Sequence, residues 1–274
     1  EFEKKWPDRF FDVGIAEQHA VTFAGALTVS GIKPFVSIYS TFLQRAVDQL
    51  IHDIGIMKLP VRLLVDRAGA VGQDGETHQG LFDIAIMKNI PNFILLAPST
   101  GEELRDMIHF AARYNEGPVA IRYPRGGIDR TEFNYEKGKS FIPGRIKKLT
   151  AGRDLAIFTF GDMVPVALKV RDLLGTRGIG VAVLNLLTIK PLDVRGIERV
   201  LGGVKRAITL ENAMISGGAG EYLLASIRPA FREKVLFCAG FPDAFITHGR
   251  NAELFRQYGI DAENLAKRIL RQVK

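Results

Sequence analysis

The chain has 274 residues, of which 47% are hydrophobic and 24% are charged, so it can form one large or two medium-sized domains, and wholesale disorder is excluded. The formal net charge is +7, but Lys and Arg are spread along the chain, so we expect no nucleic acid as partner. No apolar run reaches the roughly 18 residues that cross a bilayer, so we expect no membrane partner either.

The chain opens at residues 1–6 on a segment typical of the end of a helix, without an initiator methionine. An apolar, strand-like run at 10–13 follows, and Gly14 then permits a tight turn. Residues 19–27 are mostly apolar with helical character. Glu17 therefore lies where a strand meets a helix, and a carboxylate among apolar neighbours needs a partner. From this segment alone, the favoured interpretation of Glu17 is an acid that only stabilises the start of the helix.

Strand-like and helix-like segments alternate along the rest of the chain. Strands are predicted at 34–39, 61–65, 92–97, 119–123, 155–160, 180–184, 206–210 and 235–239. Helices are predicted at 42–51, 164–174 and 219–227, after a capping box of Ser99 and Glu102, and after a cap at Asp261. Such alternation is typical of parallel sheets with helices on both faces. The sequence therefore predicts an α/β fold of two doubly wound domains with mainly parallel sheets.

Glycines, prolines and mixed charges interrupt the alternation between the two halves of the chain. We therefore expect a first domain at residues 1–125, a linker with a hairpin at 126–152, and a second domain at 153–274.

Four chemically useful side chains lie at or just after the ends of predicted strands: Glu17, Tyr39, Arg67 and Arg125. Because ligands of open parallel sheets bind at the carboxyl ends of the strands, we expect these side chains at one edge of one sheet. A single arginine of this kind is otherwise a surface ion-pair residue that contributes little to stability.

A long, polar, glycine-rich loop is predicted at residues 66–80. Besides Arg67 it contains Asp74 and His78, and loops of this length inside a compact domain are usually functional or mobile. For His78 taken alone, the favoured interpretation is a histidine that only caps or hydrogen-bonds the loop.

Five motifs in the first half carry a more specific signal. They are Gly14-Ile15-Ala16-Glu17-Gln18-His19, Tyr39-Ser40-Thr41-Phe42-Leu43-Gln44-Arg45, Asp66-Arg67-Ala68-Gly69, Asp74-Gly75-Glu76-Thr77-His78-Gln79-Gly80 and Arg122-Tyr123-Pro124-Arg125-Gly126. Together they resemble the 1-deoxy-D-xylulose-5-phosphate synthase family, which are thiamine-diphosphate enzymes of the transketolase superfamily. The resemblance is looser in the second half, where Glu211-Asn212 and Gly217-Gly218-Ala219-Gly220 match best. It implies a thiamine pyrimidine-binding domain followed by a transketolase-type C-terminal domain.

The resemblance also implies roles for two residues toward thiamine diphosphate. Glu17 matches the glutamate that holds N1′ of the aminopyrimidine and shares a proton with that ring. Phe42 matches the aromatic residue that stacks on the pyrimidine, where its alternative is an ordinary core residue.

Enzymes of this family condense pyruvate with D-glyceraldehyde 3-phosphate and release CO2, in the first step of the non-mevalonate isoprenoid pathway. By resemblance, the phosphate of the aldehyde would be held by Tyr39, Arg67 and Arg125, since guanidinium forks suit phosphate oxygens. The residues expected around the pyruvate-derived part of the substrate are Arg45, Asp74 and His78.

The chain departs from the complete family in one respect. The family binds Mg²⁺ and the cofactor's diphosphate through a Gly-Asp-Gly segment, and the nearest match here, Gly161-Asp162-Met163, lacks the second glycine. We therefore expect the chain to be the C-terminal portion of a longer protein, with the metal ligands in its N-terminal diphosphate-binding portion. A homodimer in the bacterial cytoplasm or in a plastid is expected.

Three alternatives stay open. The chain could be the β subunit of a 2-oxo-acid dehydrogenase, although the Thr77-His78-Gln79-Gly80 and Arg125 segments fit that family poorly. Transketolase itself shares the Thr-His-Gln element but fits residues 14–19 less well. A fragment that dimerises and is inactive in isolation is the third interpretation.

Overall fold

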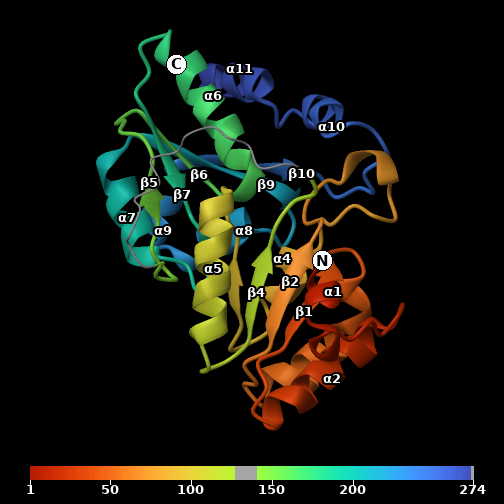
Figure 1. The fold of residues 1–274 in the computed structure, drawn as a ribbon. Helices are drawn as coiled ribbons and strands as arrows, with labels where there is room; N and C mark the ends of the chain where they lie inside the picture. Colours follow the sequence, from red (N-terminus) through yellow and green to blue (C-terminus); the bar gives the residue numbers. More distant parts are fainter. Residues whose placement is uncertain (127–140, 273–274) are drawn as a thin grey trace.

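The chain forms two five-stranded sheets in a computed structural model that describes residues 1–126 and 141–272 (Figure 1). The first sheet has the order β1 (Phe35–Tyr39), β2 (Arg62–Asp66), β4 (Val119–Arg122), β3 (Ile94–Leu96) and β8 (Thr188–Lys190). The second has the order β10 (Val235–Phe241), β9 (Arg206–Met214), β6 (Leu155–Thr159), β7 (Val181–Asn185) and β5 (Lys147–Lys148). Neighbouring strands are parallel except for β8 against β3 and β5 against β7. The predicted fold class is confirmed.

Helices cover both faces of the first sheet, because residues along each strand alternate between two apolar clusters. In β2, Leu63 and Val65 pack in the cluster that includes Val21 of α2 (Glu17–Val29), whereas Leu64 packs with Met107 of α5 (Gly101–Arg113). The predicted helix at 42–51 consists of a 3₁₀ turn (Leu43–Ala46), the short α3 (Val47–Gln49) and a π-helical turn (Leu50–Gly55). Its apolar residues pack on the same face as α2.

The second sheet follows the same rule. In β6, Leu155 and Ile157 pack with α6 (Val164–Gly175) and α11 (Ala262–Gln272), whereas Ala156 and Phe158 pack with α7 (Val194–Gly203) and α8 (Ala219–Ser226). The remaining helices are α1 (Phe2–Lys5), α4 (Asp83–Met87), α9 (Pro229–Arg232) and α10 (Asn251–Gln257).

The two sheets share one apolar core. Met87 and Phe93 from the first half lie in the same buried cluster as Phe158 and Ile189 from the second half. Ile189 belongs to β8, which leaves the second half of the chain and pairs antiparallel with β3. The sequence patterns predicted neither β8 nor α7. The three residues of β8 are too few to show a detectable alternation, whereas α7 has ten residues and a cap at Asp193 that was overlooked. The expected domain boundaries stay a prediction.

Some local predictions were wrong. Residues 10–13 have no regular secondary structure and pair with no described strand, and Phe10 and Phe11 are exposed, so the strand expected before α2 is not present. The capping box lies one residue later than predicted: Thr100 is the cap and accepts a hydrogen bond from the Glu103 backbone N–H (3.1 Å). The Glu103 carboxylate in turn accepts one from the Ser99 N–H (2.9 Å).

Two further expectations concern the linker and the membrane. The predicted linker hairpin falls partly on residues 127–140, which lie outside the described residues, and β5 pairs with β7 rather than within the linker. Across the described part of the chain, none of the helices is both long and apolar enough to span a bilayer.

Candidate active site

A cavity of about 360 Å³ lies where the start of α2, the end of β1 and the turn after β1 meet. Glu17, Tyr39, Phe42 and Arg45 all line it. The rest of the lining is largely apolar and includes Val13, Ile15, Ala16, Ala20 and Ile38. A mostly apolar pocket of a few hundred Å³ with a few convergent polar groups is the usual form of a small-molecule site.

Glu17 is the first residue of α2, directly after a turn that Gly14 makes with a φ of +68°. Its side chain is only 11% exposed, and its Oε2 lies 3.3 Å from Nη1 of Arg45. The sequence therefore placed this acid correctly at the start of a helix. The structure adds that the carboxylate lines a cavity and has a cationic partner.

The aromatic side of the pocket is built by Phe42 and its neighbours. The Phe42 ring stacks on Tyr39, with centroids 5.7 Å apart, and meets the His78 ring edge-on at 5.4 Å. The Arg45 guanidinium lies 5.8 Å from the same Phe42 ring. His78 also makes a 2.9 Å hydrogen bond through Nδ1 with the Thr77 hydroxyl.

An acid with two arginines lies next to this aromatic group. Arg67 and Arg125 approach the same oxygen of Asp74, Oδ2, at 2.9 and 2.7 Å. The Arg67 guanidinium also lies 4.1 Å from the centre of the Tyr39 ring. The hydrogen bond from Arg125, with the positive charges of both arginines, holds the pKa of the Asp74 carboxyl below its usual value.

All eight predicted site residues thus form one connected set of contacts. Tyr39 ends β1, Arg67 directly follows β2, and Arg125 lies three residues after β4, so the neighbouring parallel strands deliver them to one edge. Contacts join each remaining member to this edge: Glu17, Phe42, Arg45, Asp74 and His78. The roles of these residues stay predictions.

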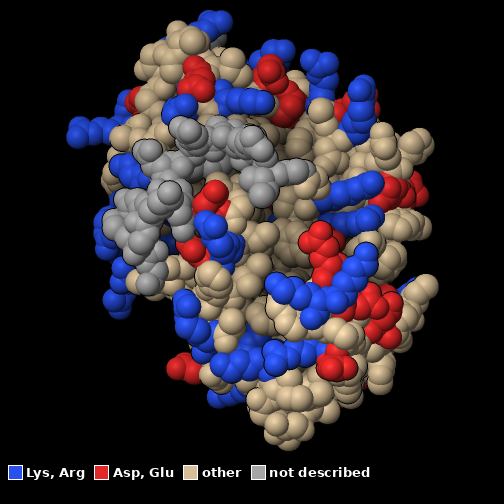
Figure 2. All heavy atoms as spheres, viewed as in Figure 1, with Lys and Arg blue, Asp and Glu red and all other residues tan. Residues whose placement is uncertain are grey.

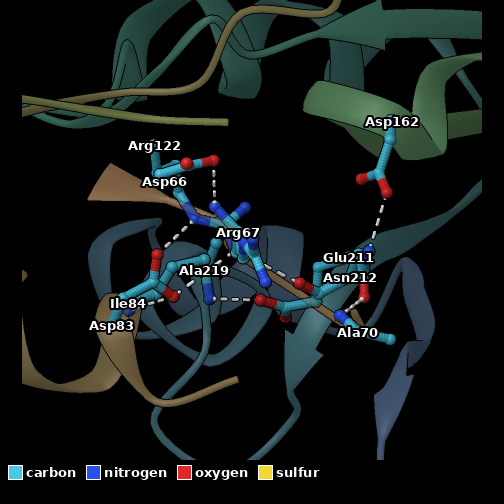
Figure 3. Close-up of polar contacts among 10 residues, drawn as sticks. All are labelled: Asp66, Arg67, Ala70, Asp83, Ile84, Arg122, Asp162, Glu211, Asn212 and Ala219. Carbon is cyan, nitrogen blue, oxygen red and sulfur yellow. Dashed lines mark hydrogen bonds and ion pairs between the residues drawn. The ribbon is translucent and has the colours of Figure 1, made fainter. Parts of the chain in front are cut away.

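A second polar cluster is buried between the two sheets (Figure 3). Nε of Arg122 donates to Oδ2 of Asp83 (2.8 Å), and Nη2 donates to the backbone oxygen of Asn212 (3.2 Å). The Asn212 side-chain Nδ2 donates to Oδ2 of Asp162 (2.7 Å), and its Oδ1 accepts from the Ala70 N–H (2.8 Å). Sequence reasoning missed this cluster. Its signal was the pair of polar residues Glu211-Asn212 inside an otherwise apolar strand.

Glu211 lies beside this cluster and holds the start of α8. Its carboxylate accepts the backbone N–H groups of Ala219 (2.8 Å) and Gly220 (2.9 Å). These bonds and Arg122 favour the charged form, but burial outweighs them and raises the pKa of Glu211 to about 7. Glu211 is therefore poised to bind a proton near neutral pH.

The two halves of a thiamine-diphosphate site fit this chain differently. The pocket at Glu17 offers an acid, an aromatic face and apolar walls, which suit an aminopyrimidine ring. In contrast, no group of three or more His, Cys, Asp or Glu residues in the described ranges is placed to hold a metal ion. Asp162 is bound to Asn212, and burial raises the pKa of its carboxyl, which opposes metal binding. The described residues do not fit Mg²⁺.

Charged side chains of both signs are exposed on one face of the molecule. On the face shown in Figure 2, Lys and Arg side chains are spread over much of the surface, with Asp and Glu among them.

Family models match both halves of the chain. The model "Transketolase, pyrimidine binding domain" matches residues 1–129, and "Transketolase, C-terminal domain" matches residues 144–265. Among solved structures, a "Split gene transketolase, inactive beta4 tetramer" aligns with a TM-score of 0.87 at 27% identity, covering 100% of this chain and 87% of that one. The transketolase of Campylobacter jejuni aligns with a TM-score of 0.77 over 95% of this chain and, at 18% identity, shows the fold alone.

Sequence relatives point to one branch of this family. The chain is 44% identical over 268 residues to the 1-deoxy-D-xylulose-5-phosphate synthase of Chlorobium phaeovibrioides. It is 45% identical over 273 residues to that of Caldanaerobacter subterraneus. These matches cover 98% and 100% of this chain but 42% and 43% of the relatives' own lengths. The chain therefore belongs to the transketolase family, as a pyrimidine-binding domain followed by a transketolase C-terminal domain, and within that family it resembles the 1-deoxy-D-xylulose-5-phosphate synthases.

Proposed function

We propose that the chain supplies the pyrimidine and substrate half of a thiamine-diphosphate site that condenses pyruvate with D-glyceraldehyde 3-phosphate. The products are CO2 and 1-deoxy-D-xylulose 5-phosphate. The observation that carries this proposal is the connected set of eight side chains, with the acid Glu17 at one end and the pair Arg67 and Arg125 at the other. The similarity to two 1-deoxy-D-xylulose-5-phosphate synthases supports the same reaction.

Two residues face the cofactor in this proposal. Bound thiamine diphosphate supplies a carbon nucleophile after loss of a proton, which is chemistry of the cofactor. Glu17 would hold a proton at the pyrimidine nitrogen, and its low exposure of 11% favours such sharing because little water competes for the carboxylate. Phe42 would offer its ring as a stacking face, worth roughly 0.5–1.5 kcal/mol beyond area burial.

The phosphate of the aldehyde would bind at Arg67 and Arg125. Each guanidinium has five N–H donors and reaches Asp74 through Nη1, so donors remain for phosphate oxygens. Asp74 offsets part of the repulsion between the two cations and keeps them together before the substrate arrives. Tyr39 supports Arg67 from one side, because its ring lies 4.1 Å from the guanidinium.

The site needs a second part in this proposal. The diphosphate and Mg²⁺ would be held by an N-terminal diphosphate-binding portion of the same protein, and a homodimer would be the assembled form. The split-gene transketolase, whose solved form is described as an inactive β4 tetramer, supports the view that such a chain is inactive alone. The relatives give no support to a 2-oxo-acid dehydrogenase β subunit. Location in a bacterial cytoplasm or a plastid stays a prediction.

Reconstitution tests the proposal. The chain, alone or with the diphosphate-binding portion of a 1-deoxy-D-xylulose-5-phosphate synthase, would be given thiamine diphosphate, Mg²⁺, pyruvate and D-glyceraldehyde 3-phosphate. We expect 1-deoxy-D-xylulose 5-phosphate only from the combination, and calorimetry should show tight cofactor binding only there. Acetyl transfer from pyruvate to a lipoyl domain, or two-carbon transfer from a ketose phosphate, in place of this product would refute the assigned reaction.

Substitution of Glu17 tests its proposed role toward the cofactor. Glu17→Ala should lower the exchange of the cofactor's reactive proton by about 10²–10⁴-fold, the usual contribution of a positioned acid or base. Glu3→Ala, which removes an exposed acid from α1, is the matched control and should change nothing. Equal proton exchange in the Glu17→Ala and control proteins would remove Glu17 from the mechanism.

A further inference from the structure

We propose that Asn251 and Asn212, both in the C-terminal half of the chain, are positioning residues for the loop at 66–80. That loop carries Arg67, Asp74 and His78. The effect on substrate rests on the proposed function, whereas the effect on the loop does not. The inference gives the C-terminal domain a specific task in the site besides packing.

The two asparagines hold the backbone of one loop residue, Ala70, from both sides. The Ala70 N–H donates to Oδ1 of Asn212 at 2.8 Å, and the Ala70 carbonyl accepts from Nδ2 of Asn251 at 2.9 Å. Asn212 belongs to β9, and Asn251 is the first residue of α10. Ala70 is fully buried, so water cannot replace either bond.

A second contact holds the far end of the loop. Nε2 of Gln79 donates to the backbone oxygen of Thr247 (3.0 Å), while its Oε1 accepts the Val71 N–H (2.8 Å). Through these two bonds Gln79, which is 3% exposed, links both ends of the loop to the segment before α10. The Gly249 N–H adds a bond to the Gly72 oxygen at 3.3 Å.

The base of the loop also belongs to the core of the second sheet. Ala70 and Leu81 lie in the buried cluster that contains Leu210, Phe241 and Ile246. The tip of the loop is different, because Asp74 and His78 are only partly buried. The C-terminal domain thus anchors the base and leaves the tip open.

The loop backbone approaches the Asn212 side chain so closely at Gly69 that no other residue type fits there. Gly69 has a φ of +85°, and a Cβ there would lie 2.4 Å from Nδ2 of Asn212. Gly69 also pairs with Gly80 through two backbone bonds of 2.7 and 2.8 Å, which close the loop two residues after Arg67. Movement of the Asn212 side chain would therefore shift Gly69 and, two residues before it, Arg67, which contacts Asp74.

Such anchoring matters because catalysis depends on close placement: a displacement of about 1 Å can reduce activity roughly 100-fold. Asn251 is the better residue to test, since Asn212 also partners Asp162 and its loss would disturb the buried cluster. Oδ1 of Asn251 has no hydrogen-bond partner among the described atoms, so Asn251→Ala removes a single bond.

The first measurement uses the chain itself and needs no activity. Hydrogen exchange followed by mass spectrometry should show amides of residues 67–80 exchanging about two- to tenfold faster in Asn251→Ala than in the wild type, as expected for one lost hydrogen bond. Asn251→Asp should have a larger effect, because it turns an acceptor toward the Ala70 carbonyl. The matched control is Asn89→Ala, which removes an amide bond to the Ala85 oxygen and should leave loop exchange unchanged.

The second measurement uses the reconstituted enzyme. Asn251→Ala should raise KM for the phosphorylated aldehyde severalfold and leave KM for pyruvate near the wild-type value, whereas general destabilisation would lower the active fraction without changing either KM. Unchanged exchange at 67–80 in both Asn251 variants would overturn the inference. Faster exchange with unchanged aldehyde KM would also overturn it, provided that Arg125→Ala does raise that KM. If Arg125→Ala has no effect either, the assigned phosphate site fails and the anchoring of the loop stands.

Discussion

Two aspartate–arginine groups in this chain have similar chemistry and different surroundings. Asp74 contacts Arg67 and Arg125 at the edge of the first sheet, and its side chain is 26% exposed. Asp83 contacts Arg122 between the two sheets, where the two side chains are 0% and 4% exposed. The open group can exchange a carboxylate for a ligand phosphate at little cost, whereas the buried group cannot lose either partner without leaving a charge in the core.

One strand supplies a cation to both groups. Arg122 ends β4, and its side chain lies in the core beside Phe160, while Arg125 follows three residues later on the open side. Residue type therefore does not distinguish a structural arginine from a binding one. The surroundings of the guanidinium distinguish them. Substitutions in the buried group should lower stability, whereas substitutions in the open group should weaken substrate binding.

The largest effect is expected from Asp83→Ala. It leaves the Arg122 guanidinium buried without its carboxylate, which should lower the free energy of unfolding by about 3–5 kcal/mol. Chemical denaturation monitored by circular dichroism measures this. The double variant Asp83→Ala with Arg122→Leu should regain much of the loss, and a double variant no more stable than the single one would contradict the explanation.

The pH dependence of stability should come largely from Glu211, beside the buried polar cluster. Because burial raises the pKa of Glu211 to about 7, the folded form binds a proton more tightly than the unfolded form, in which the carboxyl has its ordinary pKa of 4.5. The resulting stabilisation is complete below that unfolded value and is lost as pH rises through about 7. Over this window the wild type should lose up to roughly 3 kcal/mol relative to Glu211→Gln.

Denaturation at pH 5 and pH 8 measures this difference. Glu233→Gln, which changes an exposed acid that does not contribute to the raised pKa of Glu211, is the control and should keep the wild-type pH dependence. The same pH dependence in Glu211→Gln as in the wild type would show that Glu211 does not titrate in this range.

Arg125→Ala tests the open group. It should raise KM of the reconstituted enzyme for D-glyceraldehyde 3-phosphate about tenfold, at the low end for a charge-assisted bond because the side chain is 43% exposed. KM for pyruvate and the unfolding midpoint should change little. Equal increases in both KM values would argue against a phosphate contact.

The smallest effect on stability is expected from Asp74→Asn. The hydrogen bond and charge of Arg125 lower the pKa of the Asp74 carboxyl, so its stabilising contribution is present above its unfolded value and is lost only in acid. Because the group is open to water, Asn at this position should leave Tm at pH 7 within roughly 2 °C of the wild type. A loss of stability comparable to that of Asp83→Ala would show that the open and the buried aspartate–arginine groups do not differ in their contribution to stability.

Local patterns predicted much of the fold. Short apolar runs between helix-like segments predicted most strands, and Glu17 was correctly placed at the start of a helix. The predicted strand at 10–13 was wrong because an apolar run needs a neighbouring strand to pair with, and no strand among the described residues pairs with it. The short β8 was missed because its sheet partner, β3, comes from the other half of the chain.

The sequence by itself determined the order of most strands and the gathering of Tyr39, Arg67 and Arg125, because the carboxyl ends of parallel strands meet at one edge. Only the tertiary structure decided which polar groups are buried and what anchors the loop at 66–80. Asn212 and Asn251 lie 142 and 181 residues from Ala70 in the chain. No local pattern encodes such contacts, since they form only when the two sheets pack on a common core.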